Sequence, residues 1–277
     1  MPVVEAVIEP RGPYRLRHMA RSGTWTGALP GGGSATAWQR PDGAVVVRAP
    51  DAEGVDRARF MLALDDDTGP FHERFARDPL VGASARALVG YRPLRVATVA
   101  HALLRAVCGQ LIEARRARAL EHRITAACGA RAVVTQGDLR RFAPVELRRL
   151  GLAQHRATAL TRLVSGGDLE RLRGHPTDTV LRRLTAMPGI GPWSVGVLAL
   201  EGLGRYDHGL VGDLGLVKLA AALWGHWPEG HETARLLAPY GEWSGLAGEV
   251  LMLGWAQGLV PGADRDAPRR IRQRRAA

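Results

Sequence analysis

The sequence predicts a mainly α-helical protein, an orthogonal helical bundle with a small N-terminal α+β domain that contains an antiparallel sheet. Three observations support this fold class. Apolar residues recur at helical spacing from Phe71 onward, whereas residues 1 to about 70 are rich in Gly and Pro and include β-prone segments. The chain is 46% hydrophobic, which is enough for a buried core. No internal repeat is found, so a solenoid is excluded.

The N-terminal α+β domain is expected over residues 1–72. Two segments within it are β-prone, at 14–19 and 44–49, and turn-rich stretches separate them. One helix is expected at 51–64, because Asp51 can cap its start and apolar residues share one of its faces. The domain is therefore a small antiparallel sheet with a helix or two.

The helical core is expected over residues 73–262, followed by a basic C-terminal tail at 263–277. Its expected helices are 71–78, 97–128, 136–142, 144–150, 154–165, 177–186, 192–202, 213–224, 230–238 and 242–257. Start signals mark some of them, such as Pro144 at a first helical position and Thr177 before Asp178. Short helices joined by Gly-containing turns predict a compact bundle rather than a coiled coil.

The charge of the chain indicates a polyanionic partner. The formal net charge is +11 and the sequence pI is near 11.0, with Lys218 as the sole lysine among 38 basic residues. The tail holds six Arg against two Asp between Asp264 and Arg275, but the rest of the chain is basic as well. Genome base composition could explain the preference for Arg over Lys, but it does not explain the excess of basic over acidic residues.

Several classes of protein are excluded. The longest apolar stretches, 195–203 and 214–224, are shorter than the roughly 20 residues of a membrane span. The first residues lack the pattern of a signal peptide, so we expect a cytoplasmic location and no membrane partner. Cys108 and Cys128 have no further Cys or His at metal-ligand spacing, which excludes protein-bound zinc and iron–sulfur clusters. We expect both cysteines to be small buried hydrophobic residues.

The segment 184–195, Leu-Thr-Ala-Met-Pro-Gly-Ile-Gly-Pro-Trp-Ser-Val, predicts a tight hairpin between two helices. Its glycines permit positive φ and close backbone approach, and the free amides of the second helix favour an anion. Such a hairpin can hold a DNA phosphate without reading sequence. The residues expected to bind DNA here are Gly189, Ile190, Gly191, Pro192 and Ser194. By itself, this segment fits an ordinary helix-turn-helix connector equally well.

A carboxylate follows at a distinctive distance. Asp213 lies twenty residues beyond Trp193, within Leu-Val-Gly-Asp-Leu-Gly. Together, the hairpin Pro-Gly-Ile-Gly-Pro-Trp and this Asp resemble the helix-hairpin-helix (HhH-GPD) superfamily of DNA glycosylases, and within it most nearly the 3-methyladenine DNA glycosylase II family. The resemblance covers about residues 75–257, including the segments 78–82, 104–112, 142–146 and 150–157.

The resemblance implies a DNA repair enzyme that flips an alkylated purine, of the 3-methyladenine or 7-methylguanine type, out of duplex DNA. It would hydrolyse the N-glycosidic bond and leave an abasic site. Asp213 would be the catalytic carboxylate, orienting or deprotonating water or stabilising the oxocarbenium-like sugar, and it could also be a helix N-cap. Trp193 stands where bifunctional relatives carry a Schiff-base lysine, and Lys218 lies in another element, so a monofunctional enzyme is expected. Trp193 would stack on the extruded base, or serve only in helix packing.

Other positions carry weaker expectations from the same resemblance. Tyr240 and Trp243 are candidates for a second aromatic wall of the base pocket. Gln110 and Leu111 would face the DNA minor groove, with Leu111 as the wedge that fills the gap in the duplex, or as an ordinary buried leucine. Gly212 departs from the family, which often has a second acid before the catalytic one, so substrate range could differ.

The resemblance also implies a structural sodium or potassium ion, bound by the backbone carbonyls of Thr185, Met187 and Ile190. No cofactor is required for the reaction. The expected partner is double-stranded DNA with damaged bases, bound by a monomer. Two other functions stay open: a glycosylase for deaminated or otherwise damaged bases, and a non-catalytic DNA-binding protein that keeps the hairpin. Asp213 argues against the second, since a pure binder gains nothing from an acid near phosphates.

Overall fold

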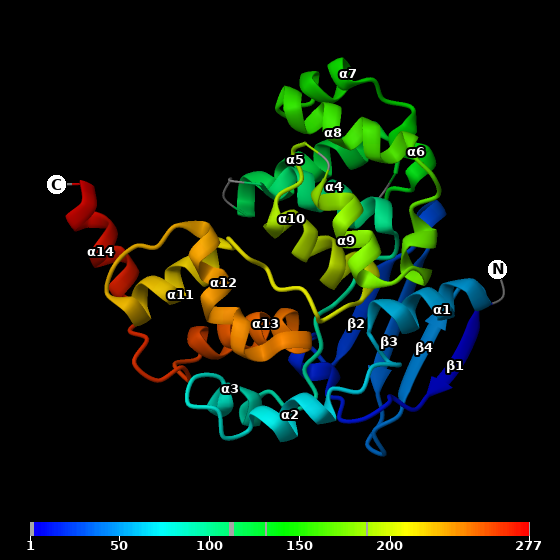
Figure 1. The fold of residues 1–277 in the computed structure, drawn as a ribbon. Coiled ribbons are helices and arrows are strands. Elements are labelled where there is room, and N and C mark those ends of the chain that lie inside the picture. The colour runs from blue at the N-terminus through cyan, green and yellow to red at the C-terminus, as the bar shows by residue number, and fades with distance from the viewer. Residues whose placement is uncertain (1–2, 111–113, 131, 187, 277) are drawn as a thin grey trace.

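The computed structural model describes residues 3–110, 114–130, 132–186 and 188–276. Helices make up most of it, and a four-stranded antiparallel sheet lies at the N-terminal end of the chain (Figure 1). The predicted fold class is therefore confirmed. Among the described residues, no helix combines the length and apolar character that crossing a membrane requires.

The sheet has the strand order β1-β4-β3-β2, with every neighbouring pair antiparallel. Its strands are β1 (Val4–Ile8), β2 (Thr24–Ala28), β3 (Ser34–Gln39) and β4 (Val45–Ala49). The strand predicted at 44–49 is confirmed as β4. It is central to the sheet and rich in valine, which suits a strand covered on both faces.

The β-strand predicted at 14–19 is wrong. Leu16–His18 form a 3-10 turn, η1, and Leu16 is fully buried beneath the sheet. The backbone N–H of Leu16 donates to the side-chain Oε1 of Gln39 at 2.9 Å, so a side chain replaces the neighbouring strand as its partner. Strand pairing goes instead to β2 and β3, whose buried alternate positions include the small residues Gly27, Ala35 and Ala37, so their signal for a strand is weak.

The helix that follows the sheet is α1 (Ala52–Met61), and it confirms the expected helix and cap. The Asp51 carboxylate accepts the N–H of Gly54 at 2.7 Å. Val55, Ala58 and Met61 are buried against the sheet. The core of this part also includes Ala97 from beyond the expected boundary at residue 72, so packing between the two parts is continuous.

The helical core is built from short helices. They are α2 (Gly69–Phe75), α3 (Gly82–Ala87), α4 (Val99–Gly109), α5 (Ala114–Ala127), α6 (Gln136–Arg140), α7 (Pro144–Arg149), α8 (Gln154–Ser165), α9 (Thr177–Thr185), α10 (Pro192–Val197), α11 (Leu214–Trp224), α12 (Thr233–Leu237), α13 (Ser244–Ala256) and α14 (Ala267–Ala276). Shorter turns are η2 (Pro30–Gly32), η3 (Glu170–Gly174), η5 (Gly230–Glu232) and η6 (Ala238–Trp243), and a π-helical turn, η4 (Leu198–Leu203), continues α10. The single helix expected at 97–128 is thus two helices, α4 and α5.

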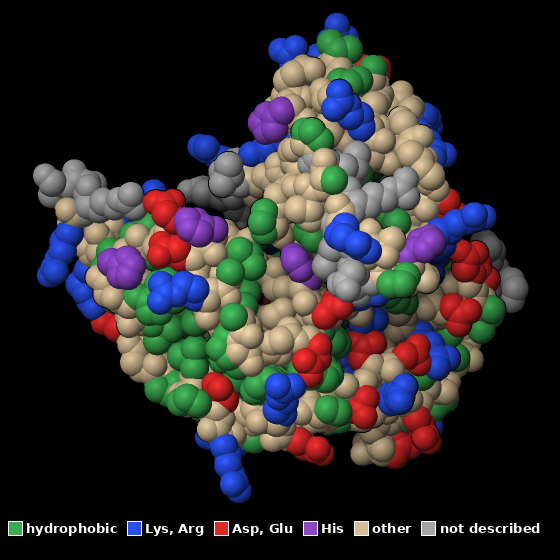
Figure 2. Space-filling view, viewed as in Figure 1, with side chains coloured by type: hydrophobic (Ala, Val, Ile, Leu, Met, Phe, Trp, Pro, Cys, Tyr) green, Lys and Arg blue, Asp and Glu red, His purple; other side chains and the backbone are tan. Residues whose placement is uncertain are grey.

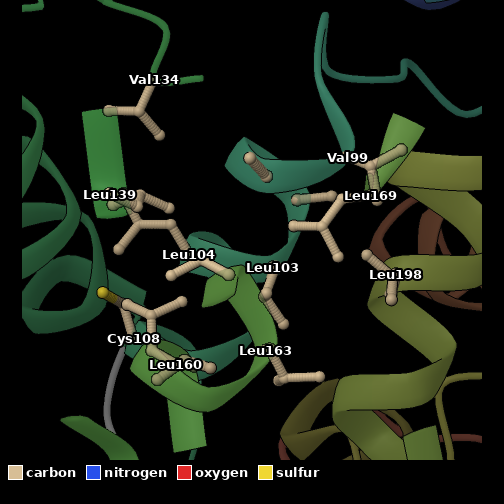
Figure 3. Close-up of a cluster of buried hydrophobic side chains, with 14 of the residues drawn as sticks. Val99, Leu103, Leu104, Cys108, Val134, Leu139, Leu160, Leu163, Leu169 and Leu198 are labelled. Atoms are coloured by element: carbon tan, nitrogen blue, oxygen red, sulfur yellow. The ribbon is translucent and has the colours of Figure 1, made fainter. Parts of the chain in front are cut away.

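Two hydrophobic cores fill the helical part. One surrounds α4, where Leu103, Leu104 and Cys108 meet side chains from α6, α8 and η4 (Figure 3). The other joins α2 and α3 to α11, α12 and α13. Chain segments before α4 therefore pack with segments after α10, and α4 and α10–η4 run along the junction of the two helical groups (Figure 1).

Both cysteines are buried and unpaired, as expected. Burial raises the pKa of the Cys108 thiol to about 12 and that of Cys128 to about 11. Neither thiol is therefore ionised near neutral pH, and both serve as packing residues.

Candidate active site

The hairpin predicted from the sequence joins α9 to α10. Gly189 has φ of 90°, a conformation that glycine adopts without strain, and Gly191 caps α10 with Pro192 at its first position. Gly189 and Pro192 are exposed, whereas Ile190 is 7% exposed and anchors the turn in the α4 core. The part of the hairpin that faces outward is therefore its backbone at the glycines.

Gln110, at the end of α4, ties that helix to the hairpin. Its side-chain Nε2 donates to the main-chain O of Gly189 and to Oγ of Ser194, each at 2.7 Å. Ser194 is itself buried at 2% exposed. Gln110 and Ser194 are thus in contact, and the hydrogen bonds of Gln110 fix the hairpin relative to α4. Their part in DNA binding stays a prediction.

Asp213 is held from two sides. Its Oδ1 accepts the N–H of Gly215 at 2.7 Å, so it is the N-cap of α11. Its Oδ2 accepts the indole Nε1–H of Trp193 at 3.0 Å. The cap role and the predicted site position therefore coexist, and the carboxylate is half-buried at the junction of α10 and α11.

Gly212 determines the backbone conformation directly before Asp213. Its φ is 87°, and its N–H donates to Oγ1 of Thr233 at 2.8 Å. An acid at this position would have to adopt the left-handed conformation. Glycine at this position thus has a backbone reason.

The ring of Trp193 lies against α4. A Cβ added to Gly109 would sit 2.4 Å from Cη2 of Trp193, so only glycine leaves room for the indole. Contact with Gly109 on one side and the hydrogen bond to Asp213 at the nitrogen together define the orientation of the ring. Trp193 remains half-exposed, so packing does not cover it completely.

Helix α13 closes the site from another side, through a residue that the sequence did not single out. A Cβ on Gly215 would lie 2.8 Å from Sδ of Met252 and 2.9 Å from Oδ1 of Asp213. Leu214, directly after the carboxylate, is 46% exposed. The contact with Gly215 places Met252 beside the Asp213 carboxylate, so Met252 is a further member of the site.

Glu249 lies near Asp213, Glu201 lies near Glu249, and neither acid was predicted. Tyr91 donates its Oη–H to Oε2 of Glu249 on α13 at 3.0 Å. Burial raises the pKa of Glu249 to about 7, the charges of Glu201 and Asp213 add to the rise, and the Tyr91 bond opposes it. Burial likewise raises the pKa of Glu201, against the attraction of Arg105.

Arg105, on α4, joins these acids to the α4 core. Its Nη1 lies 2.5 Å from Glu201, and its Nη2 lies 3.5 Å from Glu121, which also contacts His101 at 3.0 Å. Burial alone would raise the pKa of Glu121, but His101 and Arg105 hold it below its usual value. Glu121 and Glu201 lie in helical segments that carry no recognisable motif. No sequence signal therefore distinguishes these two acids from acids on the surface.

The structure does not bring Tyr240 and Trp243 to the carboxylate. Tyr240 is 1% exposed, packs edge-on against Phe75 and donates its Oη–H to Asp78 at 3.3 Å. Trp243 stacks on Tyr206 with ring centroids 5.9 Å apart. Both rings are parts of the second hydrophobic core, and the face of Tyr240 is closed to a base in this structure.

Leu111 and Met187 lie outside the described residues. The wedge and the cation site on the carbonyls of Thr185, Met187 and Ile190 therefore stay predictions. Within the described ranges, no group of three or more His, Cys, Asp and Glu residues has the arrangement of a metal site. Lys218 lines a cavity together with Trp227 and Trp255. Asp213 is not among the residues that line this cavity.

Comparisons with known proteins agree with this geometry. The chain is 30% identical over 183 residues to a Mycobacterium tuberculosis protein named as a bifunctional transcriptional activator/DNA repair enzyme AlkA, covering 60% of this chain and 35% of that one. It is 25% identical over 201 residues to DNA-3-methyladenine glycosylase of Bacillus subtilis, covering 66% of each chain. The match thus spans about a third of the M. tuberculosis relative. No protein-family profile matches the chain.

The fold is shared with a solved structure over nearly the whole length. The 3-methyladenine DNA-glycosylase of Archaeoglobus fulgidus superposes with a TM-score of 0.73 at 18% identity, covering 90% of this chain and 97% of that one. The chain is thus similar in sequence to an AlkA-type DNA repair enzyme and to a DNA-3-methyladenine glycosylase. It has the fold of a solved 3-methyladenine DNA-glycosylase.

Proposed function

We propose that this protein is a DNA glycosylase that hydrolyses the N-glycosidic bond of alkylated purines in duplex DNA, with Asp213 as its catalytic carboxylate. The observation that carries the proposal is the 3.0 Å hydrogen bond from Trp193 Nε1 to Asp213 Oδ2. It joins the hairpin helix to the carboxylate across the junction of the two helical groups. A residue from the phosphate-binding element thereby positions the acid.

The chemistry follows from this placement. Each carboxylate oxygen accepts one N–H, which keeps the group oriented as an acceptor. As the bond from C1′ of the sugar to the base nitrogen breaks, its electron pair leaves with the base, and positive charge develops on the sugar. Asp213 stabilises that charge or orients the water whose oxygen bonds to C1′, and the proton that this water loses passes to Asp213 or to solvent. A cationic alkylpurine leaves as a neutral base, so little general-acid help is needed.

DNA binding is proposed at the hairpin. The exposed Gly189 and the cap residue Gly191 precede the helical run Pro192–Leu203, and the free amides at its start, beginning with Trp193, favour a phosphate. The net charge of +11 favours a polyanion. A sodium or potassium ion on the carbonyls of Thr185, Met187 and Ile190 is part of the same proposal, because it would add positive charge at the turn.

A monofunctional reaction and extrusion of the base are proposed together. Trp193 has no nucleophilic nitrogen that could form a Schiff base. Lys218 lies five residues after Asp213 on α11 and lines the cavity that contains Trp227 and Trp255. The half-exposed indole of Trp193 offers a surface for a flipped base. The name of the B. subtilis relative supports 3-methyladenine as a substrate.

The test is release of 3-methyladenine and 7-methylguanine from methylated duplex DNA by the wild type and by Asp213→Asn. Asparagine is a good N-cap, and its single oxygen can accept the N–H of Gly215 while the bond from Trp193 is lost, so the variant should fold and bind DNA. We expect its release rate to fall by at least about a hundredfold. Absence of release by the wild type would overturn the alkylpurine substrate, and an equal rate in the variant would overturn the role of Asp213.

A further inference from the structure

A cavity of about 500 Å³ lies between α11 and the C-terminal helix α14. Two tryptophans and four cations are among its lining residues, and none of the lining residues is acidic. These six are Lys218, Trp227, Trp255, Arg265, Arg269 and Arg272. The cavity is therefore strongly positive, and it is separate from the contacts that hold Asp213.

Three contacts hold α14 and the segment that leads into it. Trp255 donates its Nε1–H to the carbonyl of Ala263 at 3.0 Å, and Nη1 of Arg265 donates to the carbonyl of Ala256 at 3.0 Å. The guanidinium of Arg272 lies 5.9 Å from the ring centroid of Trp227. The basic tail expected from the sequence is thus a docked helix rather than a loose extension.

Within the described part of the chain, none of these four cations has an acidic partner. The side chains of Lys218 and Arg269 make no hydrogen bond to the described residues either. Asp264, an acid of the same tail, is instead paired with Arg270. Because both unpaired cations face one cavity, an anion that enters it meets positive charge that no protein carboxylate offsets.

The cavity lies close enough to Asp213 to share one DNA molecule with it. Lys218 is five residues after Asp213, which is about 7 to 8 Å along the axis of α11. Figure 1 shows α14 beside α11, and Figure 2 shows the molecule indented between this edge and the upper group of helices. A duplex whose damaged base reaches Asp213 extends well beyond this distance in both directions.

We propose that the α11–α14 cavity binds a backbone phosphate of the bound DNA duplex, with Lys218 and Arg269 as the binding cations. Trp227 and Trp255 are positioning residues, since they hold α14 against the core. This inference rests on the proposed function, because it takes DNA as the ligand of the same protein. The phosphate contact adds affinity without reading sequence or taking part in bond cleavage.

The test is the salt dependence of binding to an undamaged duplex, which does not require turnover. For the double variant Lys218→Gln/Arg269→Gln we expect the slope of log Kobs against log salt to fall in magnitude by about 2, because each lost phosphate contact removes about one released counterion. Affinity at about 0.15 M salt should fall at least about fivefold.

The matched control is Arg17→Gln/Arg21→Gln, which removes two exposed charges from the N-terminal domain and should leave the slope nearly unchanged. A second variant, Trp227→Leu, keeps both cations but loosens α14, and should also weaken DNA binding. Thermal melts check that each variant folds.

A wild-type slope in the cation double variant overturns the inference. The inference is also overturned if the substitutions weaken only the binding of free inorganic phosphate and leave the affinity for duplex DNA unchanged. If the wild type binds DNA and releases methylated bases, and the cation variant has the same salt slope and affinity, only the assignment of the cavity fails. If the wild type neither binds DNA nor releases a base, the proposed function fails.

Discussion

At the scale of single residues, Asp213 illustrates how one side chain meets two demands. Its two oxygens accept from Gly215 and Trp193, so the cap that begins α11 also fixes the carboxylate for chemistry. The residue type and its separation from Trp193 were readable from the sequence. The hydrogen bond between the two was not, because it depends on how closely α10 approaches α11.

Glu249 gives a prediction about pH and stability. Its pKa is raised to about 7 in the folded protein, so between pH 4.5 and 7 the folded state binds more protons than the unfolded state. Stability contributed by the neutral form is therefore lost as pH rises through that window. We expect Glu249→Gln to raise the free energy of unfolding at pH 8 relative to the wild type, by on the order of 2 kcal/mol.

Denaturant unfolding of both proteins at pH 5 and pH 8 measures this effect. The gain should appear at pH 8 and largely vanish at pH 5, where the wild-type residue is protonated. Glu242→Gln is the control, because that acid is an exposed surface partner of Arg74. An equal gain at both pH values would contradict the assigned cause.

At the scale of elements, the decisive feature is the close approach of α4 to α10. Gly109 permits this approach, because a Cβ at this position would lie 2.4 Å from the ring of Trp193. The three atoms nearest to such a Cβ all belong to that indole. We expect Gly109→Ala to displace Trp193, weaken its bond to Asp213 and lower base release at least about tenfold, with a loss of about 1 to 3 kcal/mol in stability.

Single-turnover release and thermal melts test this prediction, with Gly137→Ala as control. Gly137 lies in α6 and has only a distant neighbour, Oγ1 of Thr135 at 3.7 Å, so alanine should fit there. If Gly109→Ala lost stability but kept the wild-type release rate, the ring position would not govern the carboxylate.

Elements also show where sequence reasoning succeeded and where it stopped. The hairpin was predicted because Gly and Pro report backbone requirements directly, and β4 because its valines suit a central strand. The strand at 14–19 failed because the side chain of Gln39, distant in sequence, supplies the partner for Leu16. Tyr240 failed as a pocket residue because aromatic spacing does not say which side of a turn faces the core.

At the scale of the whole molecule, the sheet domain and the helical core are joined by a buried ionic contact. Asp66 pairs with Arg95, whose side chain is 5% exposed, and also accepts the hydroxyl of Tyr206. Arg95 further donates to the carbonyl of Gly204 at 3.1 Å. Residues from before α2, before α4 and after η4 therefore meet at one carboxylate, which explains why packing is continuous across the expected domain boundary.

Removing that carboxylate should loosen the connection. Asp66→Asn leaves the Arg95 guanidinium buried without its counter-ion, which costs about 3 kcal/mol and lowers Tm by about 6 to 12 °C. The neighbouring Asp65→Asn is the matched control, because Asp65 is 60% exposed and pairs with Arg59 at the surface. Surface pairs of this kind contribute at most about 1 kcal/mol. Equal Tm shifts in the two variants would show that the buried contact does not hold the sheet to the core.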